Sequence, residues 1–352
     1  MIWIIVCFIP LLLPFILKKY YHHEYSWKEV AICCVVSVTI ALITIYTSTY
    51  SEMADMEVLN GKVVSKQKEA VSCRHSYSCR CYTVCSGSKT RSCHMSCSTC
   101  YEHNKDYDYN IYTTIGNFTI NAIDRQGVKE PPRYSQVIVE DPVAKTNYYL
   151  NYVKGAKNSL FNMKRYSGDS LIGLPEYPIN IYDYYKINRI VVDNTIIPES
   201  IKYNTMLAET LKDIGNAKQV NVVLVFTKRD RLFAEKLRTK WLNGKKNDIV
   251  IIISTPTYPK IDYVEVFSWS KNPMLNISMR DDIVALKDIS PATVMPVIQH
   301  NIQKHYIRRP MEDYAYLKNS VEPSFFAIMS AFIITLVFSI VFSVFAIKKD
   351  IA

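Results

Sequence analysis

"CRHSYSCRCYTVCSGSKTRSCHMSCSTC", residues 73–100, contains seven of the ten cysteines of this 352-residue chain. Two kinds of chemistry explain such a density: thiolates that bind a metal ion, or disulfides that staple a loop-rich segment. Spacing alone does not separate them, because the answer depends on the redox state of the compartment. Disulfides persist outside the cytoplasm and are rare within it. The side of a membrane on which this segment lies therefore decides how it folds.

Three apolar runs at the two ends of the chain predict membrane-spanning helices, which need about 20 residues each. Residues 1–17 carry no charge, although they are short and contain Pro10 and Pro14. Residues 30–47 form the second run, and residues 325–347 form the longest uncharged run. The first run lacks the basic start and the small-residue cleavage site of a signal peptide, so we expect a retained span.

Lysines flank the predicted spans on one side only. The loop 18–29 carries three lysines, and Lys348 and Lys349 follow the third span. The segments that border the large middle region are instead acidic and free of lysine. Because positive charge beside a span favours the cytoplasmic side, we expect the loop 18–29 and the C-terminus in the cytoplasm. Residues 48–323 are then extracytoplasmic.

An extracytoplasmic location favours disulfides in the cysteine-rich segment. Zinc is the alternative, because "CSTCYEH" (97–103) offers a C-x2-C-x2-H half-site and zinc takes four sulfur or nitrogen ligands. No second pair is cleanly spaced, and seven cysteines leave one thiol free, paired between chains, or bound to something else. The candidate residues for disulfides, or alternatively for zinc, are Cys73, Cys79, Cys81, Cys85, Cys93, Cys97, Cys100 and His103.

After the cysteines, apolar and polar positions alternate, which is typical of half-buried strands. "YNIYTTIGNFTINAID" (109–124) predicts a strand pair about a turn at Gly116, and "RYSQVIVED" and "TNYYLNYVKG" predict two further strands. We expect residues 58–157 to form one small β domain that carries the cysteine-rich segment, and residues 158–187 to be a linker.

From residue 188 the chain alternates β-branched runs with amphipathic stretches, which predicts a layered α/β domain over residues 188–318. The expected strands are "RIVVDN", "QVNVVLVFT", "NDIVIIIST" and "YVEVFSW". The expected helices are "PESIKYNTMLAETLKDIG", "RLFAEKLRTKWLNG" and the segment that begins at "PATVMPVIQ". The near-continuous apolar strands indicate a sheet covered on both faces.

This α/β region resembles the TPM-domain family of thylakoid-lumen and bacterial extracytoplasmic proteins held by a membrane helix. The residues that carry the resemblance are Asp193, Gly215, Trp241, Gly244 and Asn247. The sequence departs from the family at Asp248, where glycine is usual, and "VFSW" replaces a glycine-rich turn. The resemblance implies acid phosphatase activity, calcium binding, or assembly or repair of membrane complexes. It places a metal-binding carboxylate at Asp193, whereas the missing turn speaks against a phosphatase site.

The sequence contains no serine elbow, phosphate-binding loop or dinucleotide fingerprint. Its net charge of +10 is scattered rather than gathered into the basic stripe that nucleic-acid binding uses. We therefore expect a membrane-anchored α+β protein with three transmembrane helices, a disulfide-rich β domain and a TPM-like α/β domain. Its expected role is binding or assembly, with membrane or envelope proteins or a second copy as partners. The alternatives are a metal-dependent phosphatase and a zinc-binding interaction module.

Overall fold

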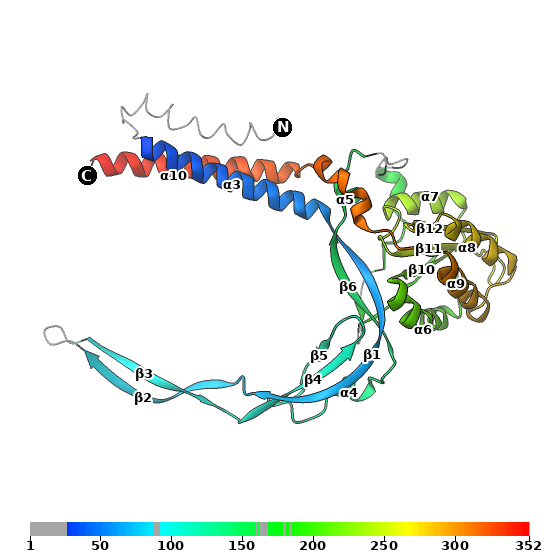
Figure 1. The fold of residues 1–352 in the computed structure, drawn as a ribbon, viewed down its shortest axis with the longest axis horizontal. Coiled ribbons are helices and arrows are strands. Elements are labelled where there is room, and N and C mark those ends of the chain that lie inside the picture. Colours follow the sequence, from blue (N-terminus) through cyan, green and yellow to red (C-terminus); the bar gives the residue numbers. More distant parts are fainter. Residues whose placement is uncertain are drawn as a thin grey trace. The chain divides into compact units, whose positions relative to one another are not determined.

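The computed structural model describes residues 27–86, 92–159, 168–178 and 185–351, together with residues 161, 166, 181 and 182. The protein has an α+β fold, and Figure 1 labels most of its helices and strands. Its chain divides into two compact units: residues 1–56, 148–167 and 310–352 form the first, and residues 57–147 and 168–309 form the second. The predicted span 1–17 lies outside the described residues.

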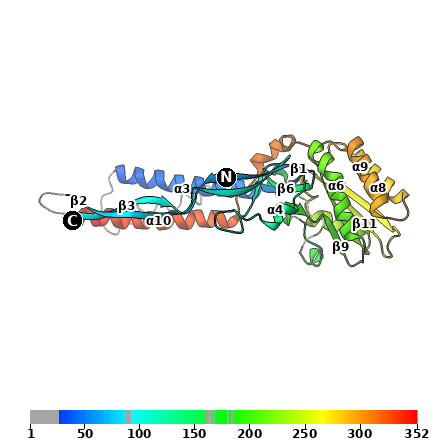
Figure 2. The same cartoon turned by 90° about the horizontal axis from the view of Figure 1, so that it is seen from below.

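Two long helices pack side by side in the first unit, α3 (Trp27–Met53) and α10 (Phe325–Ile351) (Figures 1 and 2). Residues Ala31–Met53 and Phe325–Ala346 are long and apolar enough to cross a membrane. Small side chains line their contact, since Ala41 packs against Ala331, as is common between membrane helices. The second and third predicted spans thus coincide with helices of the required length and composition.

The remaining described part of the first unit lies beside the start of the long strand β1 (Ala54–Ser72). It contains the short helix α5 (Tyr152–Gly155) and the 3-10 helix η4 (Met311–Ser320). Buried Asp55 accepts hydrogen bonds from Tyr149 at 3.1 Å and from Asn151 at 2.9 Å. These bonds satisfy a buried carboxylate at the point where the helical chain becomes a strand.

The first sheet of the second unit has the strand order β5-β4-β1-β6. Its other strands are β4 (Lys105–Thr113), β5 (Phe118–Ile120) and β6 (Pro142–Leu150). The predicted strand pair about Gly116 is confirmed, because β4 and β5 are antiparallel neighbours. The strand predicted for "RYSQVIVED" is wrong: helix α4 (Pro132–Gln136) begins there, since proline is favoured in the first turn of a helix. "TNYYLNYVKG" is strand only to Leu150 and then enters α5.

A separate two-stranded hairpin consists of β2 (Ser76–Ser86) and β3 (Ser92–Tyr101), which pair antiparallel. It follows β1 in the chain and precedes β4. No side chain described within these two strands is buried. A two-stranded hairpin without a core is marginal in water, so the hairpin needs another source of stability.

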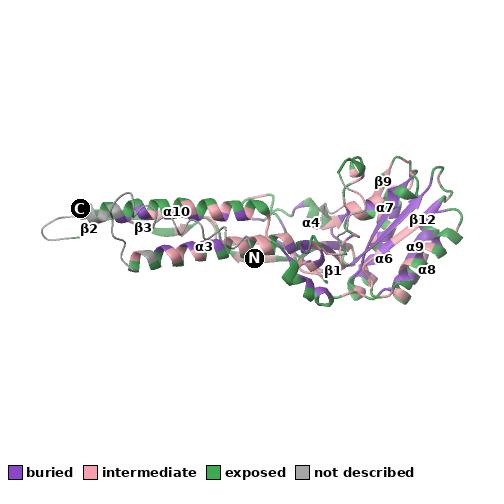
Figure 3. Cartoon of the chain, turned by 90° about the horizontal axis from the view of Figure 1, so that it is seen from above, coloured by how far each residue is buried: buried purple, intermediate pink, exposed green. Residues whose placement is uncertain are grey.

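The second sheet has the order β12-β11-β10-β9, with β9 (Ile190–Asp193), β10 (Asn221–Thr227) and β11 (Asp248–Ser254) parallel. Strand β12 (Tyr263–Ser268) runs antiparallel to β11. Every residue of β10 and β11 is buried, and the sheet is largely coloured as buried in Figure 3. These four strands confirm the predicted β-branched runs.

Helices cover both faces of this second sheet. Helices α6 (Ser200–Lys218), α8 (Met274–Ala285) and α9 (Pro291–His305) share a core with Leu224 and Ile251. Helix α7 (Arg231–Lys240) packs on the opposite face with Val225 and Ile252. Leu174, from the predicted linker, belongs to that second core. The same region contains η3 (Gly168–Leu171), β7 (Ile181–Tyr182) and β8 (Lys186–Ile187).

Candidate metal centre

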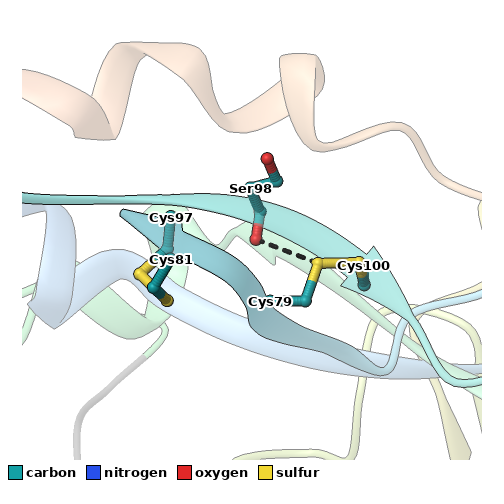
Figure 4. The surroundings of a disulfide bond; sticks show 5 residues. All are labelled: Cys79, Cys81, Cys97, Ser98 and Cys100. Carbon is teal, nitrogen blue, oxygen red and sulfur yellow. Dashed lines mark hydrogen bonds between the residues drawn. A yellow bond between two sulfur atoms is a disulfide. The ribbon is translucent and has the colours of Figure 1, made fainter. Parts of the chain in front are cut away.

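Three disulfides join the two strands of the hairpin, so the predicted disulfide-rich character of the segment is confirmed. They link Cys79 to Cys100, Cys81 to Cys97, and Cys85 to Cys93. Figure 4 shows the first two, with Ser98 beside them on β3. The backbone oxygen of Ser98 lies 3.4 Å from the Sγ atom of Cys79.

The disulfides explain how a hairpin without a buried core remains folded. They are nested and join residues separated by 21, 16 and 8 positions. A single bridge that closes a loop of this size stabilises a fold by about 2–4 kcal/mol, chiefly by restricting the unfolded chain. Nested bridges restrict the same chain, so their contributions do not simply add. Large side chains on the hairpin can then stay exposed, namely Tyr77, Tyr82, Met95 and Tyr101.

Cys73, the seventh cysteine of the segment, forms no disulfide and is buried. It lies between β1 and β2, two residues before His75. His103 lies in the connection between β3 and β4, and Asp106 is the second residue of β4. The register of the first sheet places Val71 opposite Asp106, and Glu102 donates a backbone hydrogen bond to the His75 carbonyl at 3.0 Å. The β1–β2 connection and the β3–β4 connection therefore lie next to each other at the base of the hairpin.

Four possible ligand atoms converge at this base, and all lie within 4.8 Å of one another. Nδ1 of His103 is 3.5 Å from Cys73 Sγ and 3.3 Å from Asp106 Oδ1. Nδ1 of His75 is 3.1 Å from Asp106 Oδ2. The four residues, Cys73, His75, His103 and Asp106, are called the base cluster below.

The surroundings of Asp106 favour its ionised form. The hydrogen bond from the Arg74 backbone N–H, 2.8 Å from Asp106 Oδ2, is the main reason why the pKa of this carboxyl lies below its ordinary value. Burial acts in the opposite direction, and the hydrogen bond with His75 lowers the pKa further. The guanidinium of Arg74 points elsewhere, since its Nη1 atom is 3.1 Å from Asp108. A buried carboxylate thus faces a thiol and two imidazoles.

This arrangement differs from that of a catalytic thiol. In a cysteine–histidine–acid triad, the thiol and the acid contact opposite nitrogens of one imidazole, so that the acid orients the base. Here Cys73 and Asp106 both lie nearest to the same nitrogen, Nδ1 of His103. The four possible ligand atoms are therefore arranged around a common centre, and they do not form the chain of hydrogen bonds that a proton relay needs.

The structure brings together only part of the residue set predicted for disulfides or zinc. Cys97 and Cys100 of the predicted zinc half-site are oxidised and offer no thiolate, whereas His103 and Cys73 lie in the base cluster. The predicted residue set contained neither His75 nor Asp106. The pattern C-x-H before the hairpin and H-x2-D after it was the available signal, because both halves flank the disulfide-linked cysteines.

Asp193, the metal-binding position implied by the TPM resemblance, ends strand β9. Its Oδ2 atom is 2.8 Å from Nε of Arg229 and accepts a hydrogen bond from Thr227 at 3.0 Å. Its Oδ1 atom accepts from Arg229 at 3.0 Å. Both oxygens of this carboxylate therefore have hydrogen-bond donors from the protein itself.

The other residues that carry the TPM resemblance have packing or capping roles. Buried Trp241 donates to the Pro175 carbonyl at 3.0 Å, and buried Asn247 donates to the Val58 carbonyl at 2.7 Å. Gly244 has a φ of +78°, in the left-handed region that favours glycine. Asp248, which departs from the family pattern, is buried and accepts hydrogen bonds from Tyr177 and Asn221.

No protein-family model, curated protein or solved structure matches this chain.

Proposed function

We propose that this chain is a membrane-anchored binding protein that helps to assemble a membrane or envelope complex, with the disulfide-stapled hairpin as its contact element. One observation carries the proposal: the hairpin exposes large side chains although three disulfides hold it in one conformation. A rigid element loses little conformational entropy when it binds. Tyrosine and methionine are also enriched in protein interfaces.

The anchoring part of the proposal rests on α3 and α10, which could cross a membrane. The lysines of the loop 18–29 and the pair Lys348 and Lys349 favour cytoplasmic locations for both of these flanks. In this topology, residues 48–323 lie outside the cytoplasm, where disulfides persist. A protease added to intact cells or spheroplasts should then degrade this region. If the region stays intact until the membrane is permeabilised, the topology is the reverse.

A pull-down tests the binding role. The full-length protein is recovered from detergent-solubilised membranes and compared with a variant carrying Tyr77→Ser and Tyr82→Ser. Both side chains are exposed on β2, so the substitutions should leave the fold intact and remove the recovered partner. Tyr148→Ser is the matched control, because Tyr148 is exposed but lies on β6. Identical recovery with all three proteins would contradict the hairpin as the contact element.

A metal-dependent phosphatase is the second candidate, favoured by the location of Asp193. Ligands of open α/β sheets bind beyond the carboxyl ends of parallel strands, and Asp193 ends β9 beside Thr227 at the end of β10. A cavity of about 390 Å³ next to it is lined by Asn194, Lys228 and Tyr258, among others. The full-length protein should then release phosphate from a generic ester in the presence of calcium or magnesium. Asp193→Ala should abolish the release, and a protein with no such activity would eliminate this candidate.

A further inference from the structure

We propose that Cys73, His75, His103 and Asp106 bind a zinc ion that closes the base of the disulfide-stapled hairpin. The site would be structural, because four protein ligands leave no open position on a tetrahedral ion. The zinc site depends on the chemistry of the base cluster alone. The site would form whether or not the hairpin binds a partner.

Two of the distances between the ligand atoms match the edges of a tetrahedral zinc site, and all four atoms lie within 4.8 Å of one another. Zinc bonds are about 2.3 Å to sulfur and about 2.0–2.1 Å to nitrogen or oxygen, so the edges of the tetrahedron are about 3.5 Å from sulfur to nitrogen and about 3.3 Å from nitrogen to oxygen. The observed edges are 3.5 Å from Cys73 Sγ to His103 Nδ1 and 3.3 Å from His103 Nδ1 to Asp106 Oδ1. Nδ1 of His75 lies 3.1 Å from the other oxygen of the same carboxylate, Oδ2, so each imidazole contacts one oxygen of Asp106.

An unsatisfied atom gives independent support. Oδ1 of Asp106 is buried, and no donor within the described part of the chain makes a hydrogen bond to it. Nδ1 of His103 is close enough, at 3.3 Å, but lacks the alignment of a hydrogen bond. A buried polar atom without a partner costs free energy, and coordination to a cation would remove that cost.

The ligand types select the metal. Calcium and magnesium take oxygen ligands almost exclusively, so a site with one sulfur and two imidazole nitrogens does not suit them. Thiolate, imidazole and carboxylate together are typical zinc ligands. A cavity of about 160 Å³, lined in part by His75 and Asp106, reaches the cluster and provides an entry path.

The zinc ion would cross-link the two segments that connect the hairpin to the first sheet, which no disulfide in the described part of the chain joins. All three disulfides join β2 to β3 within the hairpin. The ligands instead lie outside the hairpin. Cys73 and His75 come from the connection between β1 and β2. His103 comes from the connection between β3 and β4, and Asp106 from the start of β4. Metal removal should therefore loosen the attachment of the hairpin to the first sheet while the disulfides stay intact.

The first experiment measures metal in the full-length protein, purified in detergent without chelators. Elemental analysis should find about one zinc per chain, and Cys73→Ser and His103→Ala should lower the affinity for added zinc at least tenfold. His94→Ala is the matched control, because His94 lies within the hairpin opposite Val84, and it should retain the metal. Wild-type protein that contains no zinc and takes none from zinc sulfate overturns the proposal.

A second measurement on the wild-type protein remains informative if the variants fail to fold. N-ethylmaleimide is applied before and after treatment with a chelator, and the peptide that contains Cys73 is analysed by mass spectrometry. The proposal expects at least tenfold slower labelling of Cys73 before chelation, because a zinc-bound thiolate is protected. Equal rates before and after chelation, or Cys73 disulfide-linked to a second chain, would contradict the zinc site.

Discussion

The guanidinium of Arg189, just before β9, donates a hydrogen bond to the side-chain oxygen of Asn60 on β1. Both residues are buried, so the bond ties the first sheet to the second within one compact unit. Asn60 also donates to the Val220 carbonyl at 2.8 Å, and Arg189 donates to Asn221 at 3.1 Å. A buried charge requires such partners. The two sheets are therefore joined by a buried polar contact.

Asn60→Ala should destabilise the protein because it leaves the buried Arg189 guanidinium with one acceptor fewer. Hydrogen bonds to charged groups contribute about 1.5–3 kcal/mol. A change of 1 kcal/mol shifts the melting temperature of a domain of 150–250 residues by about 2–4 °C. Thermal unfolding of the purified protein measures the shift. Asn121→Ala, at an exposed position, should change the melting temperature by less than about 2 °C, and equal shifts in both variants would argue against the contact.

The α/β sheet was predictable from sequence because its signals are local. The residues of β10 and β11 are almost all β-branched or otherwise apolar, and such runs indicate buried parallel strands without knowledge of the rest of the chain. Helix α8 was overlooked, since "MLNISMRDDIVA" has a weak apolar periodicity, although Asn272 accepts a hydrogen bond from the Met274 N–H at 3.1 Å where the helix begins. The signal missed at α4 was local too: Pro131 is the N-cap residue and Pro132 is the first residue of the helix, and proline in the first turn is typical of a helix start.

The base cluster depends on long-range pairing, which sequence patterns do not show. Asp106 belongs to the base cluster because β1 is aligned with β4 so that Val71 lies opposite Asp106. The Cys85–Cys93 disulfide likewise follows from the hairpin register, in which these two residues face each other. The spacing of the cysteines in the sequence shows neither the pairing of β1 with β4 nor that of β2 with β3. Sequence reasoning therefore identified which residue types matter, whereas the strand register determined which of them meet.

Gly215→Ala should destabilise the protein although alanine is the better helix former. In an exposed helix interior this substitution stabilises by about 1 kcal/mol. At this position, however, a Cβ atom would lie 2.6 Å from the Cβ atom of Asn60, so helix α6 would have to move away from β1. Denaturant unfolding should show a loss of about 1–3 kcal/mol. Asn216→Ala, at the exposed neighbouring position, should be neutral or slightly stabilising, and a gain in both variants would refute the close approach.

The hydrogen bond from Tyr258 to Glu199, 2.7 Å long, should make a pH-dependent contribution to stability. This bond, and then the one from Lys202, lower the pKa of Glu199. Because the folded-state pKa is depressed, the stabilisation is complete above the unfolded value of about 4.3 and is lost as the pH falls through the folded value.

Tyr258→Phe tests this dependence. At pH 7 it should lower the free energy of unfolding only modestly, because the Glu199 side chain is 35% exposed and solvent weakens its interactions. The difference from wild type should shrink as the pH falls below about 4. Denaturant unfolding over a pH series measures it, with Tyr148→Phe at an exposed position as the control. A difference that stays constant down to pH 3 would show that Glu199 is not the partner responsible.

Peptide mapping without reductant should separate Cys73 from the six oxidised cysteines. Trypsin cuts after Lys68 and Arg74, so Cys73 leaves on residues 69–74 unless it is disulfide-linked. The remaining six cysteines lie on peptides 75–80, 81–89 and 92–105, which the observed pairing joins into one species. Loss of two hydrogens per bond makes that species about 6 Da lighter than the three reduced peptides together. Free peptides of full mass would mean that the hairpin is not stapled, and an extracytoplasmic location would then lose its chemical support.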